Sequence, residues 1–127
     1  MMILKTAALT ALLAVLAAPA FAEPDLAKGK KVFNKCKACH AVGEGAKNKV
    51  GPPLNGIIDA EIASVEGFKY SKAFIAKKGE GLVWSEAELD AYLIKPKKHT
   101  PGTKMSFAGL RKEADRINVI AYLKTFE

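Results

Sequence analysis

The alternation of apolar and polar positions along the chain predicts helices joined by long loops. Asp25 is a candidate N-cap, and the helix after it is predicted to place on one face Leu26, Gly29, Lys30 and Phe33. From residue 41 to 68 the helical period is lost and Gly and Pro recur, which predicts a long ordered loop. A loop of that length in a small domain is unusual unless it wraps around something.

The middle of the chain predicts two more helices. A short one is expected from Tyr70 to about Lys78, before the turn-like residues 79–81. Ser85–Glu88 matches a capping box, and the helix that it opens is predicted to end before Pro96. The apolar residues of this helix are Leu89, Tyr92 and Leu93.

The C-terminal part of the chain predicts a loop over residues 97–109 and a last helix that begins near Lys112. The apolar stripe of that helix is formed by Val119, Ile120, Tyr122 and Leu123, with Ile117 nearby. No alternating pattern typical of a strand and no internal repeat is present. The fold class is therefore predicted to be all-α, and about four helices leave little apolar surface to bury, so another group is expected to fill the core.

The first 22 residues resemble a secretory signal peptide rather than part of the fold. Lys5 precedes the uncharged, Ala- and Leu-rich residues 6–22, which end in Ala20-Phe21-Ala22. A membrane span needs roughly 20 apolar residues, so an uncleaved anchor is the weaker alternative. We expect cleavage after Ala22, a single domain over residues 23–127, and a location in a bacterial periplasm.

Composition narrows the possible partners. The chain has 127 residues, 20 Lys and Arg against 13 Asp and Glu, a net charge of +7, and 8% aromatic residues. A basic protein is suited to nucleic acid, a membrane surface or an acidic protein. Because the lysines are scattered and aromatic residues are few, we expect no nucleic-acid partner. The chain is expected to be a monomer.

The segment Cys36-Lys37-Ala38-Cys39-His40 is the attachment signature of c-type haem. Two thiols three positions apart lie on one helical turn, where both can bond to one edge of a haem, and the following imidazole can reach the iron. Three alternatives remain open: a thioredoxin-type dithiol, a zinc site that includes His99, and a structural disulfide. We expect one covalently attached haem c per chain, with His40 as an iron ligand.

The second axial ligand of the iron is inferred by elimination. Met105 is the only methionine after residue 22, and a His/Met pair gives an electron-transfer haem of high potential. His99 and Lys104 are the competing candidates.

The chain resembles class I cytochromes c, and most closely the bacterial cytochrome c2 group and its mitochondrial relatives. The matching segments cover essentially all of Ala27–Thr125: Phe33, Cys36-Lys37-Ala38-Cys39-His40, Gly51-Pro52, Gly67-Phe68-Lys69-Tyr70, Trp84, Tyr92-Leu93, Pro96-Lys97-Lys98, Pro101-Gly102-Thr103-Lys104-Met105, Phe107-Ala108-Gly109 and Ala121-Tyr122-Leu123-Lys124. The resemblance implies the cytochrome c fold, with helices and long loops wrapped around one haem.

The resemblance also implies roles for single residues. The Pro52 carbonyl would accept a hydrogen bond from His40, and Tyr92 would hydrogen-bond the Met105 sulfur. The haem propionates would be bound by Tyr70, Trp84 and Thr103, and the haem edge would be covered by Phe107. Gly29 and Phe33 would meet the last helix near Tyr122. The family often has an arginine that pairs with a propionate, but residues 57–61 of this chain contain no cation.

The resulting prediction is a soluble single-electron carrier that is not an enzyme. Its partners would be acidic faces of redox proteins, namely a cytochrome bc1 complex, a photosynthetic reaction centre, a terminal oxidase or a dehydrogenase. The lysines expected to steer these partners are Lys35, Lys37, Lys49, Lys97, Lys98 and Lys104. The alternative is a small haem enzyme, peroxidase-like or gas-binding, with a labile sixth ligand.

Overall fold

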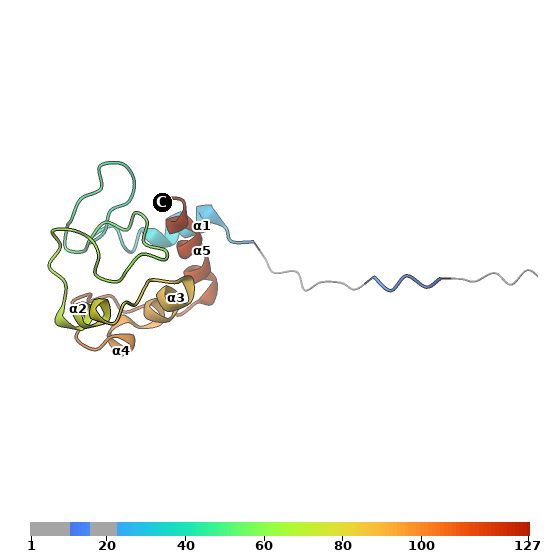
Figure 1. The fold of residues 1–127 in the computed structure, drawn as a ribbon. Coiled ribbons are helices and arrows are strands. Elements are labelled where there is room, and N and C mark those ends of the chain that lie inside the picture. Colours follow the sequence, from blue (N-terminus) through green and yellow to red (C-terminus); the bar gives the residue numbers. More distant parts are fainter. Residues whose placement is uncertain (1–10, 16–22) are drawn as a thin grey trace, which may run out of the picture.

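A computed structural model describes residues 11–15 and 23–127. Its five helices are joined by long loops: α1 Leu26–Phe33, α2 Lys72–Gly79, α3 Glu86–Ile94, α4 Pro96–His99 and α5 Glu113–Lys124. In Figure 1, α1 and α5 lie together near the C-terminus, and α2, α3 and α4 form the opposite end. Within the described ranges the only β-pairing is an isolated bridge between Glu61 and Val83, so the predicted all-α class is confirmed.

Helices α1 and α5 pack directly against each other at Gly29. A Cβ atom on this glycine would lie 2.7 Å from the carbonyl carbon of Asn118 and 2.9 Å from Cβ of Tyr122, so only glycine permits this approach. The rings of Phe33 and Tyr122 meet in the same interface with centroids 5.7 Å apart. The expected contact of the first helix with the last is therefore confirmed. The carboxylate of Asp25 accepts from Lys28 N at 3.0 Å and caps α1 as predicted.

Several predicted boundaries and faces need correction. The buried residues of α1 are Gly29, Val32 and Phe33, whereas Leu26 is half exposed. Helix α2 begins two residues later than predicted, because the Ser71 hydroxyl caps it by accepting from Phe74 N.

The predicted loop over residues 97–109 contains part of a helix. Pro96, whose fixed φ suits the first helical position, starts the short helix α4. The fold therefore has one helix more than the sequence pattern indicates. In α5 the predicted stripe is buried at Val119, Ile120 and Leu123, but Ile117 is 43% exposed and the buried polar residue is Arg116.

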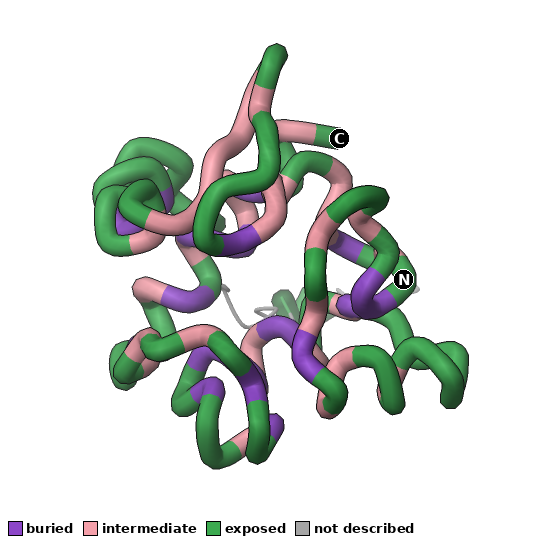
Figure 2. The backbone as a smooth tube through the Cα atoms, turned by 90° about the vertical axis from the view of Figure 1, so that its left-hand side faces the viewer, coloured by how far each residue is buried: buried purple, intermediate pink, exposed green. Residues whose placement is uncertain are grey.

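The buried hydrophobic core is formed by helices α1, α3 and α5 and by loop residues at 58–63, 84 and 110, whereas helix α2 contributes no buried residue. Figure 2 shows buried positions on segments around the centre of the molecule rather than along one helix pair. Arg116 ties three of these segments together, because its Nε donates to Asp90 of α3 at 2.8 Å and its guanidinium also donates to the carbonyls of Leu110 and Arg111. The loops are thus fixed to the helices by tertiary contacts.

The predicted signal peptide, residues 1–22, lies outside the described residues except for positions 11–15. These five residues are exposed and adopt no regular secondary structure. Over the part of the chain that is described, no helix combines the length and apolar character needed to cross a membrane. The cleavage after Ala22 stays a prediction.

Candidate haem site

The interior of the fold contains one cavity of about 300 Å³ on which the motif residues converge. Every predicted haem-site residue lines it: Cys36, Cys39, His40, Pro52, Tyr70, Trp84, Tyr92, Thr103, Met105 and Phe107. The remaining lining is mostly apolar and includes Phe33, Leu54, Phe74, Leu93 and Leu123. A largely apolar pocket with a few convergent polar groups is typical of a cofactor site.

The two cysteines and His40 lie on one helical turn that continues α1. Backbone bonds run from Cys36 N to Phe33 O at 2.8 Å and from His40 N to Cys36 O at 2.9 Å. Both thiols are free, and burial raises the pKa of the Cys36 thiol. The turn therefore presents two thiols and one imidazole along the same wall of the cavity, which fits attachment of a haem through thioether bonds.

His40 is held in a fixed orientation by backbone groups. Its Nδ1 lies 2.7 Å from the Pro52 carbonyl, which can accept the ring proton and leave the other ring nitrogen for a metal. Gly51 packs against the ring so closely that a Cβ atom there would lie 2.8 Å from Nδ1. Burial lowers the pKa of His40, so the neutral imidazole, the form that binds metal, is favoured.

Met105 reaches the same cavity from a loop after α4. Its Sδ accepts a hydrogen bond from Tyr92 Oη at 3.4 Å, and the same hydroxyl lies 2.9 Å from Thr103 Oγ1. The Met105 backbone N–H also donates to Thr103 Oγ1 at 3.4 Å. Burial raises the pKa of Tyr92, so this phenol stays protonated beyond its ordinary range. The Tyr92 hydroxyl thus holds the thioether, and the Thr103 hydroxyl holds the backbone of the same methionine.

The structure separates the three candidates for the second ligand. His99 does not line the cavity, and both its ring nitrogens are engaged: Nδ1 lies 2.8 Å from Thr100 Oγ1, and Nε2 lies 3.0 Å from Glu88 Oε1. Lys104 lines the cavity, but its Nζ donates to Lys69 O at 3.2 Å. No cluster of three or more Cys, His, Asp or Glu side chains that could hold a metal ion occurs in the described ranges.

Aromatic packing surrounds the residues implied to bind propionates. Trp84 is 7% exposed, and Phe74 meets both Trp84 and Tyr92 with ring centroids 5.7 Å apart. The Tyr70 hydroxyl accepts from Val65 N at 3.0 Å. Sequence reasoning missed Phe74, whose place three residues after the Ser71 cap was the available signal.

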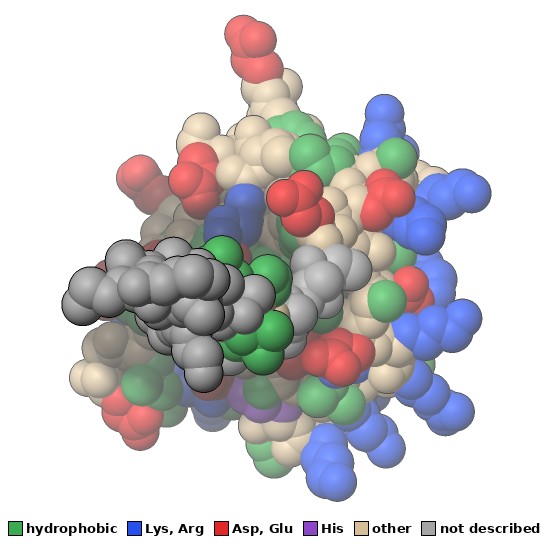
Figure 3. All heavy atoms as spheres, turned by 90° about the vertical axis from the view of Figure 1, so that its right-hand side faces the viewer, with side chains coloured by type: hydrophobic (Ala, Val, Ile, Leu, Met, Phe, Trp, Pro, Cys, Tyr) green, Lys and Arg blue, Asp and Glu red, His purple; other side chains and the backbone are tan. Residues whose placement is uncertain are grey.

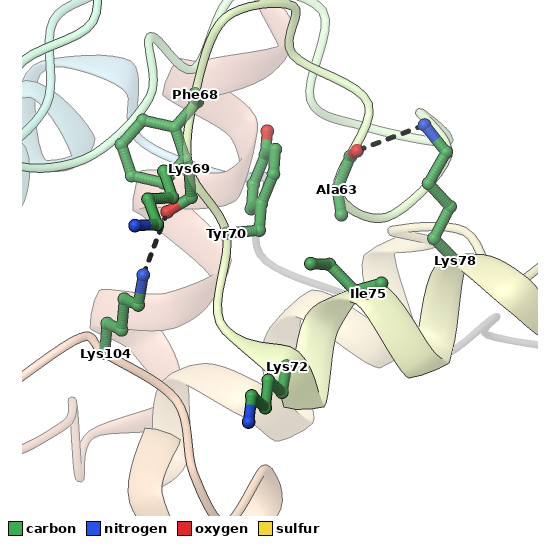
Figure 4. A pocket seen from close by; sticks show the side chains of 8 residues that line it. All are labelled: Ala63, Phe68, Lys69, Tyr70, Lys72, Ile75, Lys78 and Lys104. Carbon is green, nitrogen blue, oxygen red and sulfur yellow. Dashed lines mark hydrogen bonds between the residues drawn. The ribbon is translucent and has the colours of Figure 1, made fainter.

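A lysine-lined opening beside the cavity was also missed. Figure 4 shows the side chains of Lys69, Lys72, Lys78 and Lys104 around Tyr70 and Ile75. Lys78 Nζ donates to the Ala63 carbonyl at 3.4 Å, and Ala63 lines both the opening and the cavity. Lys72 and Lys78 therefore bring positive charge from α2 to this opening, although residues 57–61 contain no cation.

The lysines predicted to steer a partner differ in their surroundings. Lys35 lines the cavity, and Lys49 Nζ folds back to donate to Lys37 O at 2.8 Å. Lys97 and Lys98 are exposed in the last turn of α4. In Figure 3, Lys and Arg side chains gather along the right-hand edge of the molecule. The basic charge is thus unevenly distributed.

This fold and this cavity define a protein that carries one haem on a Cys-x-x-Cys-His turn. The family model for cytochrome c matches residues 26–127, so the chain belongs to the cytochrome c family. It is 57% identical over 100 residues to cytochrome c-550 of Ancylobacter novellus, covering 79% of this chain and 94% of that protein. It is 52% identical to cytochrome c2 of Agrobacterium tumefaciens (strain II Chrys), covering 80% and 91%.

A solved structure agrees with these relatives. Cytochrome c2 from Rhodospirillum Centenum superposes with a TM-score of 0.74 at 42% identity, covering 80% of this chain and 98% of that one. The expected resemblance, the cytochrome c fold and covalent haem c are thereby confirmed. Cytochromes c2 and c-550 are electron carriers, so the expectation that this chain is not an enzyme is confirmed as well.

Proposed function

We propose that this chain is a periplasmic carrier of single electrons whose haem iron is bound by His40 and Met105. Cys36 and Cys39 would form the thioether bonds to the same haem. The observation that carries this proposal is the convergence of both candidate ligands on one cavity, each already held by a protein hydrogen bond. Export and cleavage after Ala22 agree with this role. Thiols in the periplasm are prone to oxidation unless they are engaged, and here both would be engaged in thioether bonds.

The haem supplies the redox couple, and the surrounding residues set its properties. The Pro52 carbonyl orients His40, and the Tyr92 hydroxyl hydrogen-bonds the Met105 sulfur. A thioether ligand and an apolar surrounding both favour the reduced, less charged iron and so raise the potential. With His40 and Met105 both bound to the iron, small ligands would reach the iron only after one of these side chains leaves.

The polar ends of the haem would lie toward the Tyr70 side of the cavity. Tyr70, Trp84 and Thr103 are our candidates to bind the propionates, since buried carboxylates need hydrogen-bond donors. Phe107 is half-buried in the cavity wall and would cover the haem edge. These assignments rest on the lining of the cavity and on the resemblance to the family.

The partners would be redox complexes with acidic docking faces. Suitable donors and acceptors are a cytochrome bc1 complex, a photosynthetic reaction centre, a terminal oxidase or a dehydrogenase. The docking lysines would be Lys35, Lys37, Lys49, Lys97, Lys98 and Lys104, and the opening around Tyr70 adds to the positive field. Such a field accelerates encounter and weakens as salt is added.

Optical spectra of the purified protein test the ligand assignment. The oxidised protein should show a weak far-red band from sulfur-to-iron charge transfer, and Met105→Ala should abolish it. His99→Ala and Lys104→Gln should retain the band, because neither residue is a ligand. A spectrum without the band in the unmodified protein would contradict Met105 ligation and favour the small haem enzyme with an open sixth site.

A further inference from the structure

We infer that Glu88 and His99 form a latch that holds Met105 in place and limits its displacement from the iron. The inference rests on the proposed ligation by Met105 and adds two positioning residues to it. Neither residue lines the haem cavity. They act through Tyr92 and the start of the methionine loop, residues 100–107.

The first half of the latch is the contact between α3 and α4. His99 Nε2 lies 3.0 Å from Glu88 Oε1, and the two side chains are only 19% and 34% exposed. A neutral imidazole can donate from Nε2 while Nδ1 accepts from the Thr100 hydroxyl, and an imidazolium can donate from both. The bond to Glu88 therefore survives in either protonation state. Lys77 also approaches Glu88, at 3.9 Å, and adds a contact from α2.

The second half connects His99 to the groups that hold the thioether. Glu88 and Tyr92 are four residues apart on α3 and share a face, so the His99 ring meets both. Its plane stands at 83° to the Tyr92 ring, with centroids 5.6 Å apart. The hydroxyl of the same tyrosine donates to Met105 Sδ. A shift of His99 would therefore free Tyr92 to move away from the sulfur.

Hydrogen bonds within residues 100–105 form a second connection between His99 and Met105. Thr100 is 2% exposed, and its carbonyl accepts from Thr103 N at 3.0 Å. Thr103 Oγ1 in turn accepts from the Met105 N–H. Residues 103–109 form no helix or strand, so these side-chain and turn contacts carry the positioning. Breaking the latch should let the loop open more often.

Imidazole binding to the oxidised holoprotein measures how often the loop opens. Imidazole coordinates the iron only after Met105 leaves, so its rate reports the opening. We expect Glu88→Gln and His99→Gln each to raise the binding rate about three- to tenfold, the range of a partly buried, charge-assisted hydrogen bond. In a double-mutant cycle the second substitution should add little, because both remove the same contact.

Glu86→Gln is the matched control. Glu86 also lies on α3 and pairs with Lys124, but this exposed pair connects α3 to α5 rather than to the methionine loop. We expect it to leave imidazole binding at the wild-type rate. Wild-type rates in both latch variants, or an equal rise in the control, would overturn the latch. Loss of the far-red band in the unmodified protein would instead overturn the Met105 ligation, so the two failures are distinguishable.

Discussion

The two walls of the haem cavity are built in different ways. On the histidine wall, the residues at the site are fixed by backbone: Gly51 N donates to Cys39 O at 2.9 Å, and the Pro52 carbonyl receives His40. The glycine contact of α1 with α5 anchors the turn from behind. On the methionine wall, Met105 lies in a loop and is held by the hydroxyls of Tyr92 and Thr103.

This difference assigns different tasks to the two ligands. A side chain enclosed by backbone can change position only if the fold itself changes. A residue held by two hydroxyls can be released by local opening, which costs less free energy than global unfolding. We therefore expect the histidine wall to govern stability and the methionine wall to govern the potential and the access of small ligands.

The largest expected effect is on the anchor of the histidine wall. Gly29→Ala would force a Cβ atom against the backbone of α5, and overpacking of this kind should lower the free energy of unfolding by about 3 kcal/mol. Gly79→Ala is the control, because within the described chain a Cβ there would meet no atom within 4 Å apart from its chain neighbours and the backbone of its own helix. Denaturant unfolding of the holoproteins measures both. Equal stability of the two variants would contradict the anchoring role of the α1–α5 contact.

The second largest effect is expected from acid, which should lower the stability that the histidine wall contributes. Burial is the largest cause that lowers the pKa of His40, so below the ordinary value of 6.5 the unfolded chain binds the proton more readily. Stability should therefore fall as the pH falls below about 6.5. Iron coordination acts with the same sign, since a metal-bound nitrogen takes no proton.

Denaturant unfolding between pH 7.0 and 5.5 tests this dependence. The chain has two histidines, so the His99→Gln background leaves His40 as the only imidazole. Constant stability over this interval in that background would show that the proton does not compete for His40.

Local features of the histidine wall could be predicted from sequence. The Asp25 cap and the Cys-x-x-Cys-His turn depend on neighbouring residues or on a short motif, and both occur in the structure. The contact of Gly29 with the last helix is long-range, and it was expected only from the resemblance to the family. Even there, the α1 face was misjudged at Leu26. This leucine lies in the first turn of the helix, where no other part of the fold covers its side chain fully, so it is half exposed.

The supports of the methionine wall could not be predicted in the same way. Glu88 fits a capping box in the sequence, but its carboxylate meets His99, which lies eleven residues along the chain on another helix. The lysines at the opening come from α2, from the loop before it and, for Lys104, from the methionine loop. These contacts depend on how helices and loops pack together, which local periodicity does not encode.

Alkaline pH should release the methionine wall. Burial is the main cause that raises the pKa of Tyr92, so this phenol contributes stability that is complete below the ordinary value of 10.0 and is lost as the pH rises through the raised value. Tyr92→Phe removes this titration and also one hydrogen bond to sulfur. At neutral pH it should weaken Met105 ligation by about 1 kcal/mol.

The far-red band followed against pH measures this release. The band should persist to higher pH in Tyr92→Phe than in the unmodified protein. Tyr70→Phe is the control: burial raises the pKa of Tyr70 too, but its hydroxyl bonds Val65 on another loop. If both variants lose the band at the unmodified pH, Tyr92 does not control the release.

Substitution of the docking lysines is expected to change stability least. Its effect on the rate of electron transfer distinguishes the two walls. Lys37 lies on the histidine turn, and Lys97 lies on α4 beside the methionine loop. Lys104, next to Met105, lines the opening around Tyr70 together with Lys69, Lys72 and Lys78, so a partner should meet the stronger field on this side. At low salt, Lys97→Glu should slow electron transfer to an acidic partner about tenfold and Lys37→Glu about threefold, with both differences shrinking as salt is added. Unfolding free energies should change by less than about 0.5 kcal/mol. Stopped-flow kinetics with a purified bc1 complex measures the rates, and a larger loss in Lys37→Glu would place the docking face on the histidine wall instead.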